Sequence, residues 1–250
     1  MAQAQPSSSQ PTAPPFAVSS DDSQWTMPTK NFAATRYSEL SEINVDNVKN
    51  LQVAYTFSLG VNRGQESAPL VANGTLYVVS PFPNILYALD LTQAGAPLKW
   101  QYNPKATAAA QGVACCDTVN RGPTYADGRI YFNTLDAYTV AVDAQTGQEI
   151  WKTKIGEINM GETMTMAPLV AKDKVIVGIS GGEYGVRGWI EALDANTGKS
   201  VWKAYSTGPD QDVKIGPDFK PFYDSDKGKD LGATTWPPSA WQQGGGTVWG

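Results

Sequence analysis

Three stretches of the 250-residue sequence follow one pattern: ALDLTQAGAPLKW (residues 88–100), AVDAQTGQEIW (residues 141–151) and ALDANTGKSVW (residues 192–202). In each stretch a small residue, an apolar residue and an aspartate are followed by a turn and then by a tryptophan. The three tryptophans lie 51 residues apart. A repeat of this length is typical of an array of similar supersecondary units. The repeat decides the architecture, and the architecture decides which residues can meet at one site.

Each repeat is predicted to contain four short strands, because runs of β-branched and aromatic residues alternate with Asn-Gly, Asp-Gly and Thr-Gly turns. The predicted strands are Ala68–Val71, Thr75–Ser80, Ile85–Asp90 and Lys99–Tyr102, then Pro123–Tyr125, Arg129–Asn133, Tyr138–Asp143 and Glu149–Lys152, then Pro168–Val170, Val175–Ser180, Trp189–Asp194 and Ser200–Lys203. Four strands per unit around a channel describe a β-propeller. A β-sandwich with coincidental spacing is the alternative, and three phased tryptophans disfavour it.

The sequence holds three complete blades, and a fourth is expected to begin near Gly246–Gly250. Propellers typically close with four to eight blades, and an open array would expose strand edges. We therefore expect residues 25–250 to be the N-terminal part of a propeller domain in a longer protein. Residues 1–24 are rich in Pro and Ser and are predicted to be a disordered leader.

Composition excludes several function classes. Hydrophobic residues make up 41% of the chain, and no segment approaches the roughly 18 apolar residues of a membrane-spanning helix, so we expect no integral membrane protein. The net charge is −5 and there is no long basic run, which argues against nucleic-acid binding. The first twenty residues lack the charged and apolar regions of a signal peptide.

Histidine is absent, so no histidine base, histidine metal ligand or Ser-His-Asp triad can exist in this stretch. Chemistry must depend on carboxylates, arginine, the backbone, aromatic rings and two cysteines. Any metal would lie among oxygen atoms, which suits a hard cation such as Ca²⁺ better than Zn²⁺.

The two cysteines, Cys115 and Cys116, are adjacent in the sequence. A bridge between neighbours would be strained, because relaxed disulfides hold their Cα atoms well apart. Such a bridge would suggest a functional platform in an oxidising compartment. The residues alone leave open a second reading, two buried reduced thiols.

Strand direction alternates within a blade, so the connection into the first strand and the loop between the second and third strands emerge on one face. Polar residues, an aromatic residue and two glycines occupy these positions and should converge on one mouth of the central channel. They are Glu66, Arg121, Thr165, Ser180, Gly181, Gly182, Glu183, Thr247 and Trp249. This set suits a flat, polyanionic ligand with a bound cation. The repeated aspartates Asp90, Asp143 and Asp194 are predicted to be turn acceptors and not catalysts.

The motifs CCDTVNRG (residues 115–122), SGGEYGVRG (180–188), KDLGATTW (229–236) and GGGTVWG (244–250) resemble those of the pyrroloquinoline quinone (PQQ)-dependent alcohol dehydrogenases, in particular the methanol dehydrogenase-like large subunits. The resemblance extends from about Trp25 to Gly250 and implies an all-β, eight-bladed β-propeller with tryptophan-docking repeats. It also implies a PQQ cofactor, Ca²⁺ or a lanthanide, and a periplasmic location.

The resemblance assigns roles to individual residues. Cys115 and Cys116 would form a vicinal disulfide against one face of PQQ, and Trp249 would stack on the other face. Arg121 would pair with the carboxylate or quinone oxygens of PQQ. The remaining predicted cofactor contacts are Glu66, Thr165, Ser180, Gly181, Gly182 and Thr247, and Glu183 would bind the metal. Each assignment has a structural alternative: blade packing for Trp249, a surface position for Arg121, a solvated loop for Glu183 and turn or cap roles for the hydroxyl residues.

The implied reaction is oxidation of a primary alcohol, of the methanol or ethanol class, to an aldehyde, with electrons passed to a cytochrome c. The resemblance also leaves room for a homodimer. The catalytic Asp and further metal ligands of the family follow the GGGT-x-WG motif, so we expect no catalytic residue before Gly250 and no turnover by residues 1–250 alone. Two rivals are a non-enzymatic propeller scaffold, such as an outer-membrane assembly lipoprotein, and a glucose or aldose dehydrogenase that uses PQQ. Neither is expected to carry the adjacent cysteines.

Overall fold

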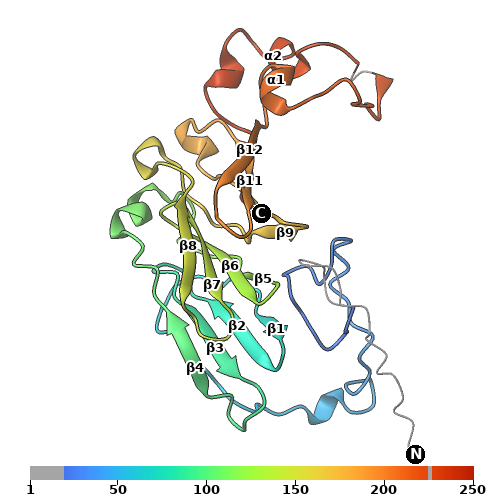
Figure 1. Ribbon diagram of the computed structural model, residues 1–250, viewed down its shortest axis with the longest axis vertical. Coiled ribbons are helices and arrows are strands. Elements are labelled where there is room, and N and C mark those ends of the chain that lie inside the picture. Colours follow the sequence, from blue (N-terminus) through green and yellow to red (C-terminus); the bar gives the residue numbers. More distant parts are fainter. Residues whose placement is uncertain (1–19, 225–226) are drawn as a thin grey trace, which may run out of the picture.

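The computed structural model describes residues 20–224 and 227–250 and contains three four-stranded antiparallel sheets. Each sheet pairs its strands in chain order, and the three sheets lie side by side in the order of the sequence (Figure 1). The predicted all-β class and the three propeller blades are therefore confirmed. Residues 1–19 of the predicted leader lie outside the described residues.

The strand bounds agree with the repeat pattern to within a few residues. Blade 1 comprises β1 (Leu70–Ala72), β2 (Thr75–Val79), β3 (Leu86–Asp90) and β4 (Leu98–Tyr102); blade 2 comprises β5 (Thr124–Ala126), β6 (Arg129–Thr134), β7 (Tyr138–Asp143) and β8 (Glu149–Lys154); blade 3 comprises β9 (Leu169–Ala171), β10 (Lys174–Gly178), β11 (Trp189–Asp194) and β12 (Ser200–Tyr205). The first strand of each blade begins one or two residues later than predicted, because the prolines at positions 69, 123 and 168 precede the paired residues.

The tryptophans of the repeat join each blade to the next. The ring of Trp100 lies against Gly147, where an added Cβ would come within 2.6 Å of the ring. Trp151 lies in the same way against Gly198, and its indole Nε1 donates a hydrogen bond to the Ala195 carbonyl at 3.0 Å. Trp202, the third of the series, is 38% exposed. The repeat therefore records docking of a tryptophan onto the Thr-Gly turn of the following blade.

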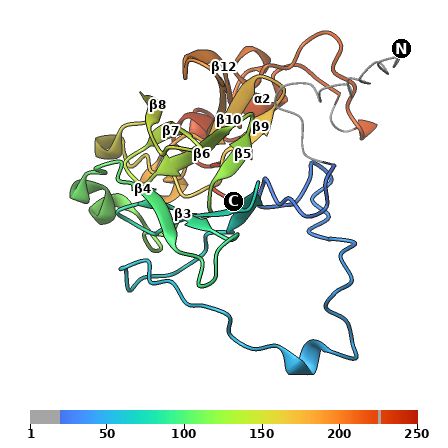
Figure 2. The ribbon, with the colours of Figure 1, turned by 60° about the horizontal axis from the view of Figure 1, so that its bottom comes forward.

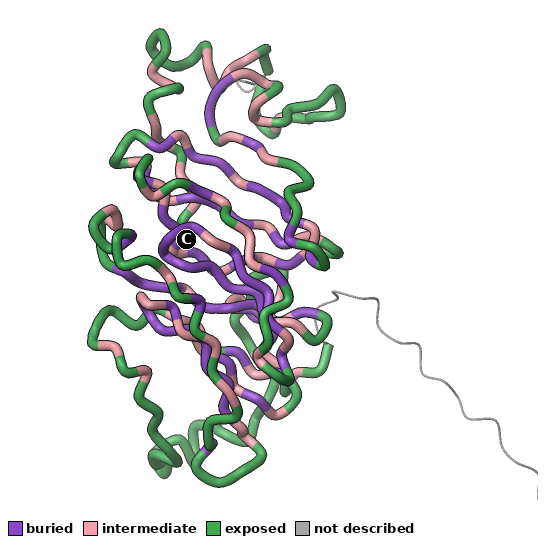
Figure 3. Tube along the Cα trace, turned by 60° about the vertical axis from the view of Figure 1, so that its left-hand side comes forward, coloured by how far each residue is buried: buried purple, intermediate pink, exposed green. Residues whose placement is uncertain are grey.

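Buried apolar side chains form two clusters, one between blades 1 and 2 and the other between blades 2 and 3. The buried segments lie where the sheets face each other, while the loops are exposed (Figure 3). Tyr77 and Tyr131 repeat one contact in these layers. The Tyr77 hydroxyl donates to the Ala144 carbonyl at 3.0 Å, and the Tyr131 hydroxyl donates to the Ala195 carbonyl at 3.1 Å. The blades are thus held face to face by packing and by matched hydrogen bonds.

The three repeated aspartates close the turns between the third and fourth strands. The Asp143 carboxylate accepts hydrogen bonds from the backbone of Gln145 and Thr146 and from the Thr146 hydroxyl. These donors favour the charged form and lower the pKa of Asp143. Asp194 and Asp90 accept the same kinds of bond. The predicted structural role of these aspartates is confirmed.

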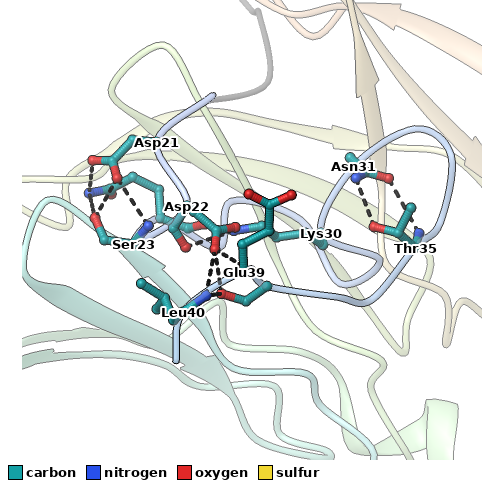
Figure 4. Close-up of polar contacts among 10 residues, drawn as sticks. Asp21, Asp22, Ser23, Lys30, Asn31, Thr35, Glu39 and Leu40 are labelled. Atoms are coloured by element: carbon teal, nitrogen blue, oxygen red, sulfur yellow. Dashed lines mark hydrogen bonds and ion pairs between the residues drawn. The ribbon is translucent and has the colours of Figure 1, made fainter. Parts of the chain in front are cut away.

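The N-terminal segment docks on blade 1. The Trp25 backbone forms an antiparallel bridge with Val71 of β1. Close by, the Lys30 ammonium lies 2.9 Å from an Asp22 carboxylate oxygen and is largely buried. The other Asp22 oxygen accepts from the Ser38 hydroxyl and the Glu39 backbone N–H, both at 2.6 Å (Figure 4). Residues 20–24 of the predicted leader therefore make defined contacts.

Two long segments leave the blades. Residues 31–66 run out from blade 1 and carry only the short turn η1 (Val48–Asn50) (Figure 2). After β12, residues 206–243 carry α1 (Asp210–Val213), α2 (Leu231–Thr234) and η6 (Ala240–Gln242) beyond the third sheet (Figure 1). Within the part of the chain that the structure describes, no helix has the length and apolar character needed to cross a bilayer. The other short turns are η2 (Ala108–Val113), η3 (Ile158–Met160) and η4 (Gly182–Tyr184).

Candidate functional site

The loops that lead into the first strands of the blades surround a cavity of about 210 Å³. The loop between β10 and β11 completes its wall. The lining residues are Glu66, Ala114, Cys115, Cys116, Asp117, Val119, Arg121, Thr163, Thr165, Ser180, Gly181, Glu183 and Trp249. All the residues predicted for the site line this cavity except Gly182 and Thr247. The blade topology thus brings together side chains that are up to 183 positions apart, from Glu66 to Trp249.

Arg121 joins three parts of the cavity wall. One guanidinium nitrogen, Nη2, lies 3.0 Å from a Glu66 carboxylate oxygen. The other, Nη1, donates to the Thr165 hydroxyl and to the Trp249 carbonyl, both at 2.8 Å. The planar fork of arginine can hold partners in several directions at once, which a lysine ammonium cannot do with the same geometry. The side chain is one-quarter exposed, so it remains accessible from the cavity.

Cys115 and Cys116 form a disulfide with each other, and both residues are exposed toward the cavity. This bond decides between the two readings that the residue pattern left open. The next residue, Asp117, has a φ of 146°, a backbone conformation that residues other than glycine rarely adopt. Its carboxylate accepts hydrogen bonds from the backbone of Thr118 at 2.6 Å and of Gly64 at 3.2 Å. The disulfide loop is therefore tied to the segment that carries Glu66.

The backbone bonds around Asp117 also set its charge state. The hydrogen bond from the Thr118 N–H is the main reason that the pKa of Asp117 is lowered, and the Gly64 N–H adds to it. Asp117 is one of four lining residues that the sequence argument missed; the others are Ala114, Val119 and Thr163. Its place in the CCD motif was the available signal, whereas the other three carry no chemistry that a pattern would single out.

Glycines let two backbones meet beside the cavity. Gly181 has a φ of 103°, and a Cβ there would lie 2.1 Å from the Gly161 carbonyl oxygen. Gly182 begins η4, and a Cβ on it would meet the Thr247 side chain at 3.1 Å. Thr247 and Gly182 therefore pack against each other directly behind the lining residues. The Thr165 and Ser180 hydroxyl oxygens lie 3.5 Å apart on the wall itself.

Trp249 covers one side of the cavity and is 53% exposed. Its ring centroid lies 5.0 Å from the Arg121 guanidinium carbon, within the range of a cation–π contact. The segment before it is held by blade 3, since the Val248 N–H donates to the Ile179 carbonyl at 3.0 Å. Residues 246–250, where a fourth blade was expected to begin, form no named strand. Trp249 is thus presented to the cavity by the edge of blade 3.

The donor set suits an organic anion better than it suits a metal ion. An arginine and three hydroxyl residues offer hydrogen-bond donors, and the disulfide and the indole ring offer flat apolar surfaces. Glu183 is an exposed carboxylate on η4 at the rim. In residues 20–224 and 227–250, no group of three or more Cys, Asp and Glu side chains is arranged to hold a metal. Arg121 and the hydroxyl residues therefore suit a cofactor with carboxylates, and Glu66, Asp117 and Glu183 add three carboxylates to the same wall.

Comparison with known proteins shows the family to which the chain belongs. The family described as "PQQ: Glucose/ethanol/alcohol dehydrogenase, beta-propeller domain" matches residues 25–249. The lanthanide-dependent methanol dehydrogenase of Methylacidiphilum fumariolicum is 53% identical over 91% of this chain and 37% of the relative. Methanol dehydrogenase (cytochrome c) subunit 1 of Methylobacterium organophilum is 48% identical over 93% of this chain and 38% of the relative.

A solved structure of a europium-containing methanol dehydrogenase superposes with a TM-score of 0.90 at 52% identity, covering 92% of this chain and 40% of the other. The chain thus spans about two fifths of the length of these relatives. The family match covers nearly the whole chain beyond the predicted leader. The chain belongs to the family of PQQ-type glucose, ethanol and alcohol dehydrogenases and has its β-propeller fold.

Proposed function

We propose that the intact protein oxidises primary alcohols of the methanol or ethanol class, with PQQ bound in the cavity between the disulfide and Trp249. One observation carries the proposal. The vicinal disulfide, Arg121 and the Trp249 ring line the same cavity. A non-enzymatic scaffold has no need to bring these groups together. Two relatives that are 53% and 48% identical to this chain over their matched residues are named methanol dehydrogenases.

The residues of this chain would bind and orient the cofactor. Arg121 would pair with an anionic edge of PQQ, because its guanidinium is held at a fixed angle by Glu66 and Thr165. The hydroxyl groups of Thr165 and Ser180 would donate hydrogen bonds to the same edge. The disulfide and Trp249 would enclose the flat faces and exclude water from the ring. Thr247 and Gly182 would support the wall from behind, as their close packing suggests.

Glu183 would supply one carboxylate ligand to a Ca²⁺ or lanthanide ion at the rim of the cavity. Oxygen donors are the ligands that such hard cations prefer. When bound, the metal acts as a Lewis acid and PQQ accepts the two electrons released as the alcohol becomes an aldehyde. We assign none of the residues that line the cavity as the base that takes the hydroxyl proton. The part of the reaction that residues 25–250 would serve is therefore binding, orientation and exclusion of water.

The partners and the location are further parts of the proposal. One relative is named as a cytochrome c-linked subunit, which supports a cytochrome c as the electron acceptor of the intact protein. A periplasmic location fits the exposed disulfide, because oxidising compartments preserve such bonds. A homodimer and a closed ring of eight blades are proposed from the resemblance alone.

The test is dye-linked oxidation of methanol, ethanol and glucose by the intact purified protein, supplied with PQQ and either Ca²⁺ or La³⁺. We expect turnover of the primary alcohols that depends on the metal, and a loss of at least about tenfold in apparent metal affinity for Glu183→Gln. Glu42→Gln, a change at an exposed carboxylate outside the cavity, is the control and should behave like the parent. Oxidation of glucose but not of alcohols would overturn the proposed substrate class.

A further inference from the structure

Arg187 lies just before β11, outside the cavity lining, and its side chain is only 18% exposed. Its guanidinium carbon lies 3.9 Å from the ring centroid of Tyr205 and 4.6 Å from that of Trp241. Tyr205 ends β12, and Trp241 lies in η6. One arginine is therefore held between two aromatic rings, one at each end of the segment of residues 206–243.

The polar atoms of Arg187 bind the same segment. Nε donates to the Thr207 carbonyl at 3.1 Å, and Nη2 forms an ion pair with Asp212 at 2.7 Å. Gly208 makes room for this contact, since a Cβ there would come within 2.1 Å of Nη2. The Thr207 hydroxyl in turn donates to the Trp241 carbonyl at 3.1 Å. The guanidinium thus holds both ends of the 206–243 segment, Thr207 at its start and Trp241 near its end, at one place.

The backbone on either side of Arg187 holds the residues that follow the segment. Gly245 forms a parallel bridge with Arg187: its N–H donates to the Val186 carbonyl at 3.0 Å, and its carbonyl accepts from the Gly188 N–H at 2.8 Å. A Cβ on Gly188 would lie 2.0 Å from the Gly246 carbonyl oxygen. The strand-like run of residues 244–246 therefore has one register on blade 3, and Trp249 follows three residues later.

The site of Arg187 rests on the core of blade 3. Lys203 on β12 places its ammonium 3.6 Å from the ring centroid of Trp189 and 5.9 Å from that of Tyr205. Trp189 is 1% exposed and belongs to the core between blades 2 and 3. Cationic and aromatic side chains therefore alternate from the core to the surface, in the order Trp189, Lys203, Tyr205, Arg187 and Trp241. Such contacts gain strength when they are shielded from water, so Arg187 has a rigid support.

We propose that Arg187 is a positioning residue for Trp249. Its side chain clamps the ends of the 206–243 segment beside the Val186 and Gly188 backbone groups that hold Gly245, and so fixes where the Trp249 ring meets the cavity. Arg187 itself does not line the cavity. The proposal rests on the proposed function only in expecting that a displaced Trp249 weakens PQQ binding.

The position of Trp249 can be read without cofactor. The intact protein is labelled with 5-fluorotryptophan, and the ¹⁹F resonances of Trp249, Trp241 and Trp202 are assigned by single Trp→Phe changes. In Arg187→Met we expect the Trp249 resonance to shift or broaden, while that of Trp202 stays in place. Arg129→Met is the matched control, because it removes an arginine that bridges to Asn196 of blade 3 away from the cavity. It should leave the Trp249 resonance unchanged.

A Trp249 resonance that stays in place while that of Trp241 moves would overturn the proposal and leave Arg187 as an anchor of the segment alone. Should Arg187→Met fail to fold, Arg187→Lys and Asp212→Asn are judged by the same two resonances.

PQQ titration of the same variants separates the positioning of Trp249 from the binding of PQQ. We expect PQQ binding to weaken about three- to tenfold in Arg187→Met, the size of a misplaced aromatic contact. A parent protein that binds no PQQ would contradict the proposed function and leave the resonance test valid.

Discussion

Arg121 shows how one residue type can determine a site. Its guanidinium contacts Glu66, Thr165 and Trp249, which come from the entrances of blades 1 and 3 and from the end of the described chain. A lysine would keep the charge, but its single nitrogen could not hold these partners at fixed angles. A change at Arg121 should also affect the cavity wall, because Glu66, Thr165 and Trp249 all line the cavity.

Asp22 gives a test of the N-terminal docking by pH. The Ser38 hydroxyl and then Lys30 donate to its carboxylate and lower the pKa of Asp22 from the ordinary 3.8 to about 2. Because the pKa is depressed in the folded protein, this contact stabilises the fold fully above pH 3.8 and is lost as the pH falls through about 2. A ¹³C NMR titration of the Asp22 carboxyl should give a midpoint near 2.

Ser38→Ala removes the strongest of these donors and should raise the Asp22 midpoint. Ser41→Ala, a change at a nearby exposed position, is the control and should leave it unchanged. A midpoint near 3.8 in the parent protein would contradict the contacts of Asp22 with Ser38, Glu39 and Lys30.

At the level of elements, the Thr-Gly turn is the docking surface for the tryptophan of the preceding blade. Gly147 has a φ of 72°, and Trp100 fills the space that its Cβ would need. Gly147→Ala should therefore incur both the cost of a left-handed side chain, about 1–2 kcal/mol, and an overpacking cost of about 1–3 kcal/mol. Denaturant unfolding of the intact protein, followed by tryptophan fluorescence, measures the sum.

Gly128→Ala is the matched control for this prediction. Gly128 is also in a turn of blade 2 with a φ of 74°, but nothing lies within 4 Å of its Cβ position. Gly128→Ala should lower the free energy of unfolding only by the cost of a left-handed side chain, about 1–2 kcal/mol. Equal losses in free energy of unfolding for the two variants would show that tryptophan docking adds nothing at Gly147.

The repeat predicted the blades well because each strand and turn is encoded locally. The bounds of strands β2, β3 and β6 agree with the predicted bounds within one residue. The apolar pattern of each strand and the turns beside it lie close together in the sequence, so both can be read locally. The outer strands β8 and β12 run two residues further than predicted. Their ends pair with Tyr138 and Trp189, and such pairing is not visible in the outer strand's own sequence.

The site could be predicted only where topology and motif agreed. Arg121 and Glu183 follow from the loop positions, and the disulfide between Cys115 and Cys116 required the family resemblance. Asp117 and Arg187 were not found. Asp117 accepts from the adjacent Thr118 N–H and from the Gly64 N–H, which lies 53 positions away. Arg187 acts through rings at both ends of a segment with no repeat pattern. Contacts of this kind depend on the folded chain and leave no periodic signal.

At the scale of the whole molecule, the three blades bring distant loops to one cavity, and we propose that this cavity binds PQQ. The most direct test is an equilibrium titration of the intact protein with PQQ, followed by quenching of tryptophan fluorescence. We predict saturable binding of one PQQ per chain, weakened at least about tenfold by Arg121→Met, because charged hydrogen bonds are lost. Arg129→Met should leave the affinity unchanged. Absence of saturable binding, or equal affinity for the parent and Arg121→Met, would contradict binding of PQQ at this cavity.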